Sequence, residues 1–321
     1  MSTIVSHLAS IRLTLAAMAL SGLGALAASL TTLPSDLGLA LPFALLALNL
    51  AAAVATNGVF RRQTPLLIFH VALLVIVLLA AVSRLTYLNG RAEVLEGEPF
   101  TGELVEVDAG AFHPWRLERA AFINRGFTVE YREGLRRGPT RNRVEWIGED
   151  GRQQIAVIGD TEPLRLAGYR FYTTPNKGFA PTFVWQPAGG RPVRGAVHLP
   201  SYPLNDFRQA REWTLPGLPE TAWVMLKLDG PLIDPARAGD FRLPDDDRVV
   251  LRVGDRRAVL RPGERLDLPE GSLMYTGLRT WMGYSISFDW TAPWMLASAL
   301  LALASLGWHY MVRFSRGAQG R

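Results

Sequence analysis

Four long apolar segments constrain the fold of this chain more than any other feature. They are Ile11–Thr31, Leu37–Val59, Pro65–Ser83 and Thr291–Val312. A helix needs about 20 apolar residues to cross a bilayer, and each segment has roughly that length. None of them shows the polar stripe of a helix on the surface of a soluble protein. We therefore predict a membrane protein with three N-terminal transmembrane helices and one C-terminal transmembrane helix.

The Lys and Arg residues next to the predicted spans indicate which ends of the spans lie in the cytoplasm. The loop at 34–36, between the first two spans, has no Lys or Arg, so the positive-inside rule places it outside. The same rule places both termini in the cytoplasm and residues 89–290 outside the cytoplasm. Residues 89–290 hold 27 basic and 28 acidic residues, so the net charge of +5 does not indicate nucleic-acid binding. The basic residues that indicate the cytoplasmic ends of the spans are Arg61, Arg62, Arg313, Arg316 and Arg321.

The first segment also has an alternative interpretation as a cleaved signal peptide. Ala25-Leu26-Ala27 resembles a cleavage site made of small residues. The apolar run continues to Leu30, and Arg12 is the only charge near its start, which favours a retained span. The resulting regions are 1–88 with three spans, 89–290 as an outer domain, and 291–321 with the last span and a short tail.

Residues 89–290 form a predicted β-rich, sandwich-like domain. Alternating apolar and polar residues predict strands at 127–131, 248–253 and 284–288. Turn signals recur at 149–151, 188–190, 229–231 and 261–263. The pattern predicts two packed sheets. A weak helical period covers Leu204–Trp213, and the arginine-rich stretch Arg136–Arg143 is expected to be an exposed loop.

Several kinds of chemistry are excluded or disfavoured by the residues present. The chain has no cysteine, so it has no disulfide, no thiolate metal site and no covalent haem attachment. No nucleophile elbow, HExxH, Walker loop or dinucleotide motif occurs. Asp245-Asp246-Asp247 lacks the spaced ligands and loop glycine of a calcium loop and is expected to be a solvated turn.

His70 is the candidate site residue, because it lies inside the third predicted span. Its neighbours three and four positions away, Leu66, Leu67, Leu73 and Leu74, are all apolar. An ionisable side chain inside a membrane is costly and suggests a function, and a neutral imidazole has one lone pair free to bind iron. The open alternative is a histidine that hydrogen-bonds to a neighbouring helix, for instance near Asn49.

The other histidines carry weaker hypotheses. His309 lies at the inner end of the last span beside Trp308 and Tyr310, which favours interface anchoring. His113 and His198 are expected in loops, either exposed or satisfied by a hydrogen bond, and His7 lies in the N-terminal tail.

The ordered combination of motifs resembles the ResB family of cytochrome c biogenesis proteins, which belong to the system II pathway. That family has three spans, a large outer β domain and a last span. The stretches that carry the resemblance extend over most of the chain. They are Ser10–Leu15, Leu48–Leu50, Phe69–Leu73, Gly90 with Glu96–Glu98, Pro163–Tyr172 and Lys177–Phe183.

The resemblance implies a role in haem handling at the bacterial cytoplasmic membrane. ResB-like proteins work with CcsA, a multispan membrane protein, to move haem across the bilayer and present it to apocytochrome c. His70 matches the family's proposed axial haem ligand in the third span, and CcsA would supply the second ligand. This role is that of a non-catalytic subunit.

Two other hypotheses stay open at this stage. The chain is shorter than typical family members, and a membrane-anchored β-domain module without haem fits it as well. An ectoenzyme would need a deep pocket that joins His113 or His198 to paired carboxylates.

Overall fold

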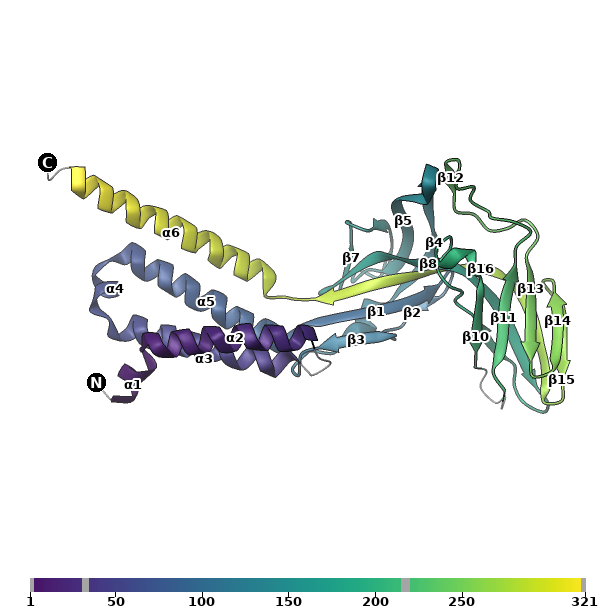
Figure 1. The fold of residues 1–321 in the computed structure, drawn as a ribbon, viewed down its shortest axis with the longest axis horizontal. Coiled ribbons are helices and arrows are strands. Elements are labelled where there is room, and N and C mark those ends of the chain that lie inside the picture. Colours follow the sequence, from purple (N-terminus) through teal and green to yellow (C-terminus); the bar gives the residue numbers. More distant parts are fainter. Residues whose placement is uncertain (1–2, 31–34, 215–219, 319–321) are drawn as a thin grey trace. The chain divides into compact units, whose positions relative to one another are not determined.

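A computed structural model describes residues 3–30, 35–214 and 220–318 of the chain (Figure 1). These residues divide into two compact units. Unit 1 comprises the described residues up to Asn89, the segment Asp108–Trp115, and the residues from Ser287 onward. Unit 2 comprises Gly90–Val107 and the described part of Arg116–Ile286.

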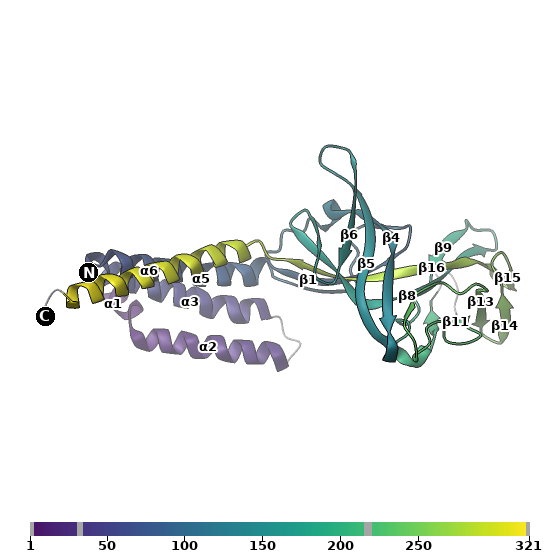
Figure 2. The same cartoon turned by 90° about the horizontal axis from the view of Figure 1, so that it is seen from above.

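Unit 1 is a set of helices, of which the longer ones contact one another in the order α2, α3, α5 and α6. Figure 2 shows α3 between α2 and α5, in agreement with these contacts. The helices are α1 (Thr3–Leu8), α2 (Ile11–Leu30), α3 (Ser35–Thr56), α4 (Gly58–Arg62), α5 (Thr64–Thr86) and α6 (Ala292–Ala318).

Three of these helices contain segments that are long and apolar enough to cross a membrane. The segments are Gly38–Thr56, Thr64–Thr86 and Ala292–Ser315. They coincide with three of the four predicted spans, and their length and composition are consistent with a membrane-embedded protein. The apolar part of α2, Ile11–Ala27, is shorter. A fourth span therefore stays a prediction, and the last residue of that predicted span, Thr31, lies outside the described residues.

Unit 2 is β-rich, as the alternating pattern predicts, but it contains three sheets where two were expected. The largest sheet has the order β3-β1-β16-β8-β7, and β15 and β9 pair with β16 and β8. Its strands are β1 (Leu88–Leu95), β3 (Glu106–Ala109), β7 (Leu164–Leu166), β8 (Tyr169–Pro187), β9 (Val193–Ala196), β15 (Arg265–Leu268) and β16 (Gly271–Phe288).

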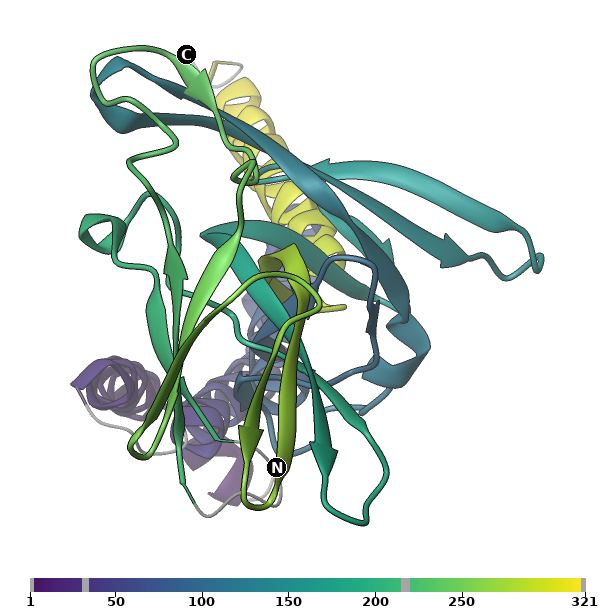
Figure 3. The ribbon, with the colours of Figure 1, turned by 90° about the vertical axis from the view of Figure 1, so that its right-hand side faces the viewer.

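The other two sheets have four and five strands. One has the order β10-β11-β13-β14, and Figure 3 shows its green strands toward the viewer. The other has the order β12-β4-β5-β6, with β2 paired to β4. Their strands are β2 (Pro99–Phe100), β4 (Phe122–Arg132), β5 (Arg136–Ile147), β6 (Gln153–Gly159), β10 (Ala210–Trp213), β11 (Ala222–Lys227), β12 (Gly239–Asp240), β13 (Arg248–Val253) and β14 (Arg256–Leu260).

The long strands β8 and β16 supply two groups of buried aromatic side chains in unit 2. Phe183 and Tyr275 belong to a core shared with β11 and β13. Phe171 and Tyr284 instead contact Phe122 of β4, with ring centroids 5.2 Å apart in both pairs. One pair of strands thus contributes to two hydrophobic clusters, which explains how a chain of this length supports three sheets.

Two local predictions are wrong. Arg136–Arg143 lies in strand β5, because Thr140, Asn142 and Val144 alternate into the interior while arginines occupy the exposed positions between them. Leu204–Trp213 contains only a 3-10 turn, η3 (Asn205–Phe207), followed by β10. The other described 3-10 turns are η1 (Leu117–Ala120) and η2 (Glu133–Leu135).

The three predicted strands are confirmed, since they lie within β4, β13 and β16. Each of the four turn signals lies mostly or wholly outside the strands, between consecutive strands of the chain.

Candidate functional site

His70 lies in the second turn of α5, about six residues from the start of that helix at Thr64. At 1.5 Å per residue this places it about 9 Å along the helix axis. Gln63 precedes the helix and Pro65 occupies its first turn, where a proline costs no helical hydrogen bond. The local sequence therefore fixes where α5 begins, and with it the depth of His70.

The imidazole of His70 forms one hydrogen bond, and that bond is within its own helix. Nδ1 lies 2.7 Å from the backbone carbonyl oxygen of Leu66. A carbonyl oxygen can only accept, so Nδ1 carries the proton and donates it. In the neutral imidazole the lone pair then belongs to Nε2. Within the described residues, no hydrogen-bond partner lies against Nε2.

Aromatic side chains hold the ring of His70 in place. The ring of Phe60, from the short helix α4, lies 4.2 Å from the imidazole centroid at an angle of 40°. Phe69 contacts it edge-on at 5.2 Å. A neutral imidazole with one nitrogen bonded to a carbonyl and the other free is the arrangement that metal-binding histidines use. The donor set therefore fits one axial ligand of a haem iron.

The alternative role for His70, a hydrogen bond near Asn49, is wrong. The buried side chain of Asn49 donates to the carbonyl oxygens of Leu8 and Ser10, at 2.6 and 3.0 Å, and accepts from Thr14 Oγ1 at 2.6 Å. Asn49 thus joins α3 to the start of α2 and satisfies its own polar atoms. His70 is satisfied by its own helix instead.

The structure does not bring the other histidines to His70. His309 of α6 is half-buried, and its ring contacts Tyr310 at 5.5 Å. His113 is buried, with Nδ1 2.9 Å from the carbonyl oxygen of Thr86. That position confirms the satisfied alternative for His113 and makes the exposed one wrong.

His198 has an acidic partner in unit 2. Its Nδ1 lies 2.9 Å from Glu93 Oε2, and its ring stacks on Trp281 at 5.1 Å with an angle of 6° between the planes. Glu93 and His198 are 105 positions apart, so no local sequence pattern could have indicated this pair. Four cavities of unit 2 include neither His198 nor His113 in their walls, so they lend no support to the ectoenzyme hypothesis.

The pair makes a small, pH-dependent contribution to stability that can be measured. The hydrogen bond from His198 is the main cause that lowers the pKa of Glu93. The pKa of Glu93 is lower in the folded protein than in the unfolded chain. The pair therefore stabilises the fold fully at pH values above the ordinary pKa of a glutamate. This stabilisation is lost as the pH falls through the lowered pKa. We expect Glu93→Gln to reduce the free energy of unfolding by about 1 kcal/mol at pH 7, and by much less at pH 3.

Urea unfolding of the detergent-solubilised protein at the two pH values measures this difference. Glu106→Gln is the matched control, because Glu106 forms an exposed ion pair with Arg91 at 3.1 Å. A loss that is equal at both pH values would contradict the role of the Glu93 carboxylate.

Two residues of the acidic run Asp245-Asp246-Asp247 have protein partners. Asp246 pairs with Arg248 at 3.1 Å, and Asp247 accepts a hydrogen bond from Tyr275 at 2.5 Å. Across the described ranges, no three His, Asp or Glu side chains lie close enough to hold a metal ion.

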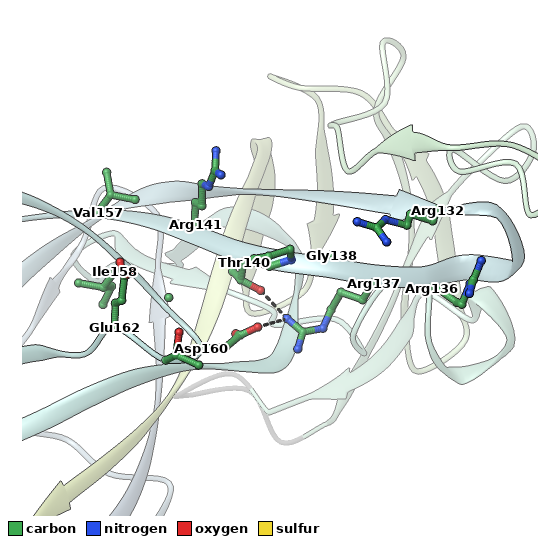
Figure 4. A pocket seen from close by; sticks show the side chains of 13 residues that line it. Arg132, Arg136, Arg137, Gly138, Thr140, Arg141, Val157, Ile158, Asp160 and Glu162 are labelled. Atoms are coloured by element: carbon green, nitrogen blue, oxygen red, sulfur yellow. Dashed lines mark hydrogen bonds and ion pairs between the residues drawn. The ribbon is translucent and has the colours of Figure 1, made fainter.

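A cavity of about 730 Å³ lies beside the arginine-rich strand β5 (Figure 4). Arg137 points to Asp160, with a distance of 2.7 Å, and also donates to Thr140 at 2.7 Å. Arg132, Arg136 and Arg141 also line the cavity, and in the described structure they form no ion pair. The cavity therefore has more cationic groups than its own carboxylates neutralise.

Two comparisons with known proteins add no relative to this picture. None of the protein-family models matches the chain, and no curated protein is significantly similar to it. The class that the fold and the site define is thus a protein with three apolar helices of membrane-spanning length, two before and one after a β-rich region in the sequence. It carries a histidine with a free Nε2 inside one of its membrane-length helices.

Proposed function

We propose that this chain is a ResB-like subunit of the system II cytochrome c biogenesis machinery. The observation that carries the proposal is the state of His70, whose Nδ1 proton is held by the Leu66 carbonyl so that Nε2 faces no protein partner in the described structure. A lone pair presented in this way inside an apolar helix has little purpose in packing alone. It suits an iron ligand.

The organisation of the chain supports the same proposal. Two membrane-length helices precede the β-rich region and a third follows it, in agreement with the family layout if α2 also spans the membrane. The basic residues at the α4 end of α5 and at the end of α6 favour cytoplasmic locations for both. We infer that unit 2 lies outside the cytoplasm and that the protein is in the bacterial inner membrane.

In this role His70 would supply one axial ligand to haem, and a CcsA-type partner would supply the other. The side chains of α5 around His70 are apolar, so they would shield the macrocycle from water. The thiols that react with haem belong to apocytochrome c, which makes this chain a non-catalytic subunit of the complex.

The test is an absorption spectrum of the protein purified in detergent with a coexpressed CcsA-type partner. We expect a Soret band that loses most of its intensity per mole of complex in His70→Ala. His309→Ala is the matched control, because it removes a histidine from α6 that does not contact His70, and it should leave the band unchanged. In His70→Gly, added imidazole should restore the band by replacing the missing ligand.

An unchanged Soret band in His70→Ala would remove His70 from the ligand set. An intact complex without haem in any preparation would overturn the haem role and favour the membrane-anchored β-domain module.

A further inference from the structure

Strand β6 forms an end of its sheet and is unusual in its composition. Within the described residues, β5 pairs with one edge of β6 and no strand pairs with the other. Its seven residues, Gln-Gln-Ile-Ala-Val-Ile-Gly, include no charged residue and no proline. The hairpin of β5 and β6 projects from the rest of unit 2 in Figure 2. A free edge of this kind invites pairing with another chain.

The other strands at sheet ends and branches of unit 2 are protected by their sequences. Charged residues or a proline occur in every one of them, which is how natural sheets discourage edge-to-edge association. The protected strands are β2, β3, β7, β9, β10, β12, β14 and β15. Strand β6 is the exception among the described edges.

Aliphatic side chains cover the outer face of the β5–β6 hairpin. Ile155 and Val157 of β6 are 52% and 57% exposed, and Ile147 of β5 is 68% exposed. Ile155 and Val157 are two positions apart in β6, so they lie on the same face of the strand. Together they form an apolar strip next to the free edge.

Arginines lie beside this strip. Arg143 is the cross-strand partner of Val157, and Arg141 is the partner of Gly159, so both share a face with the strip. Within the described residues, Arg143 forms a single ion pair, a long one of 3.8 Å to Glu145. Arg141 also lines the cavity of Figure 4, whose wall includes Val157, Ile158 and Gly159 of β6.

We propose that the free edge of β6 binds an extended, acidic segment of another polypeptide as an additional strand. The backbone of the segment would hydrogen-bond to β6, its apolar side chains would cover Ile155 and Val157, and its carboxylates would pair with Arg141 and Arg143. This is the β-augmentation mode of recognition. The inference is independent of His70 and of the proposed haem role.

Charge favours an acidic partner over a second copy of this chain. Pairing of two β6 strands would leave the arginines of both copies without carboxylate partners, whereas an acidic segment would supply those partners. Glu145 is the one acidic residue of β5 on the face that carries Arg141 and Arg143. Its carboxylate pairs with Arg125 at 2.7 Å and accepts a hydrogen bond from Gln153 at 3.0 Å.

The experiment uses the full chain in detergent and a fluorescent nine-residue peptide of alternating valine and glutamate, blocked at both ends. Fluorescence anisotropy measures binding. We expect the acidic peptide to bind at least tenfold more tightly than the same peptide with lysine in place of glutamate. Raising the salt concentration should weaken binding, because exposed arginine–carboxylate pairs are screened.

Two variants address the two halves of the proposal. Val157→Glu places on β6 a charge that repels an acidic segment, and Arg143→Glu reverses a charge on β5 without changing β6. Each should weaken binding of the acidic peptide at least tenfold. Val259→Glu is the matched control, because Val259 is a 49% exposed valine on the edge strand β14. It should bind the peptide as the wild type does.

Three outcomes would overturn the proposal. The first is that both peptides bind equally or that neither binds. The second is that Val259→Glu weakens binding as much as Val157→Glu does. The third is a wild-type dimer that Val157→Glu dissociates, because β6 would then serve self-association. Far-ultraviolet circular dichroism of each variant verifies that the sheets are intact.

Discussion

Replacing Asn142 by alanine should lower the free energy of unfolding by about 4 kcal/mol, because one buried amide serves three partners. Asn142 Nδ2 donates to Asn124 Oδ1 at 2.8 Å and to the carbonyl oxygen of Gly126 at 2.7 Å. Asn142 Oδ1 accepts from the hydroxyl of Tyr284 at 2.7 Å. Each buried polar group left without a partner costs about 1–3 kcal/mol.

The network connects two sheets, which is why we expect its loss to destabilise unit 2 as a whole. Asn124 donates to the carbonyl oxygen of Val94 at 2.9 Å and accepts from the backbone N–H of Gly126. Gly126 has a φ of +87° at a register shift of β4, a conformation that glycine adopts without strain. The amides therefore fix a bulge in one sheet and tie it to strands of another.

Urea unfolding followed by tryptophan fluorescence measures the effect. Tyr284→Phe should cost about 1 kcal/mol, because it removes a single hydrogen bond. The double variant should show coupling between the two sites. Asn89→Ala is the matched control, because Asn89 is exposed, and its effect should stay within about 0.5 kcal/mol. A cost of under about 1 kcal/mol for Asn142→Ala would contradict the role of the network.

The helical part of this fold could be predicted from the sequence because the signal is local and long. Roughly 20 apolar residues in succession permit few structures other than a spanning helix. The strands at 127–131 and 284–288 were predictable for a similar reason, since one face of each is buried and the residues alternate. The strand at 248–253 was indicated by its apolar residues instead, because Val249, Val250 and Leu251 are buried in succession. The sheet count was not predictable, because β8 and β16 are long enough to enter two hydrophobic clusters.

The arginine-rich stretch shows where local composition misleads. Arg136–Arg143 has few apolar residues, so the sequence indicated a loop. The structure buries Thr140 and Asn142 by satisfying their polar atoms, and the arginines occupy the exposed positions. A strand with a polar interior face has no apolar alternation to detect. The pair of Glu93 and His198 could not be predicted for a different reason, because its two residues are 105 positions apart.

Part of the candidate site was predictable as well. The depth of His70 follows from residue counting along the third apolar segment. The identity of its hydrogen-bond partner does not, because a histidine in a helix can bond to its own backbone or to another helix. The contact with Phe60 depends on how the short helix α4 folds back on α5, and no periodic pattern specifies that turn.

Raising the pH from 8 to 9.5 should stabilise the protein by about 2 kcal/mol, because Lys177 is buried as an ammonium group. Lys177 is fully buried, and its Nζ donates to the carbonyl oxygen of Thr174 at 2.9 Å. Burial is the main cause that lowers its pKa to about 8. The charge of Arg137 acts in the same direction, and Asp160 opposes it.

The sign follows from proton counting. Between the folded pKa of about 8 and the ordinary value of 10.5, the unfolded chain holds the Lys177 proton and the folded chain does not. Stability therefore rises with pH across this interval. Tyrosines limit how high the pH can be raised in this measurement, since burial raises the pKa of Tyr131 to about 12. A tyrosine with a raised pKa opposes folding once the unfolded chain ionises near pH 10.

The two lysines of the chain provide a matched comparison for urea unfolding at pH 7, 8, 9 and 9.5. Lys177→Met should remove the rise in stability, because no proton remains to be released. Lys227→Met should retain it, because Lys227 is exposed at the end of β11. A rise that persists in Lys177→Met would assign the pH dependence to another group. A flat profile in the wild type would mean that the ammonium group keeps its ordinary pKa, with water or Asp160 compensating for its burial.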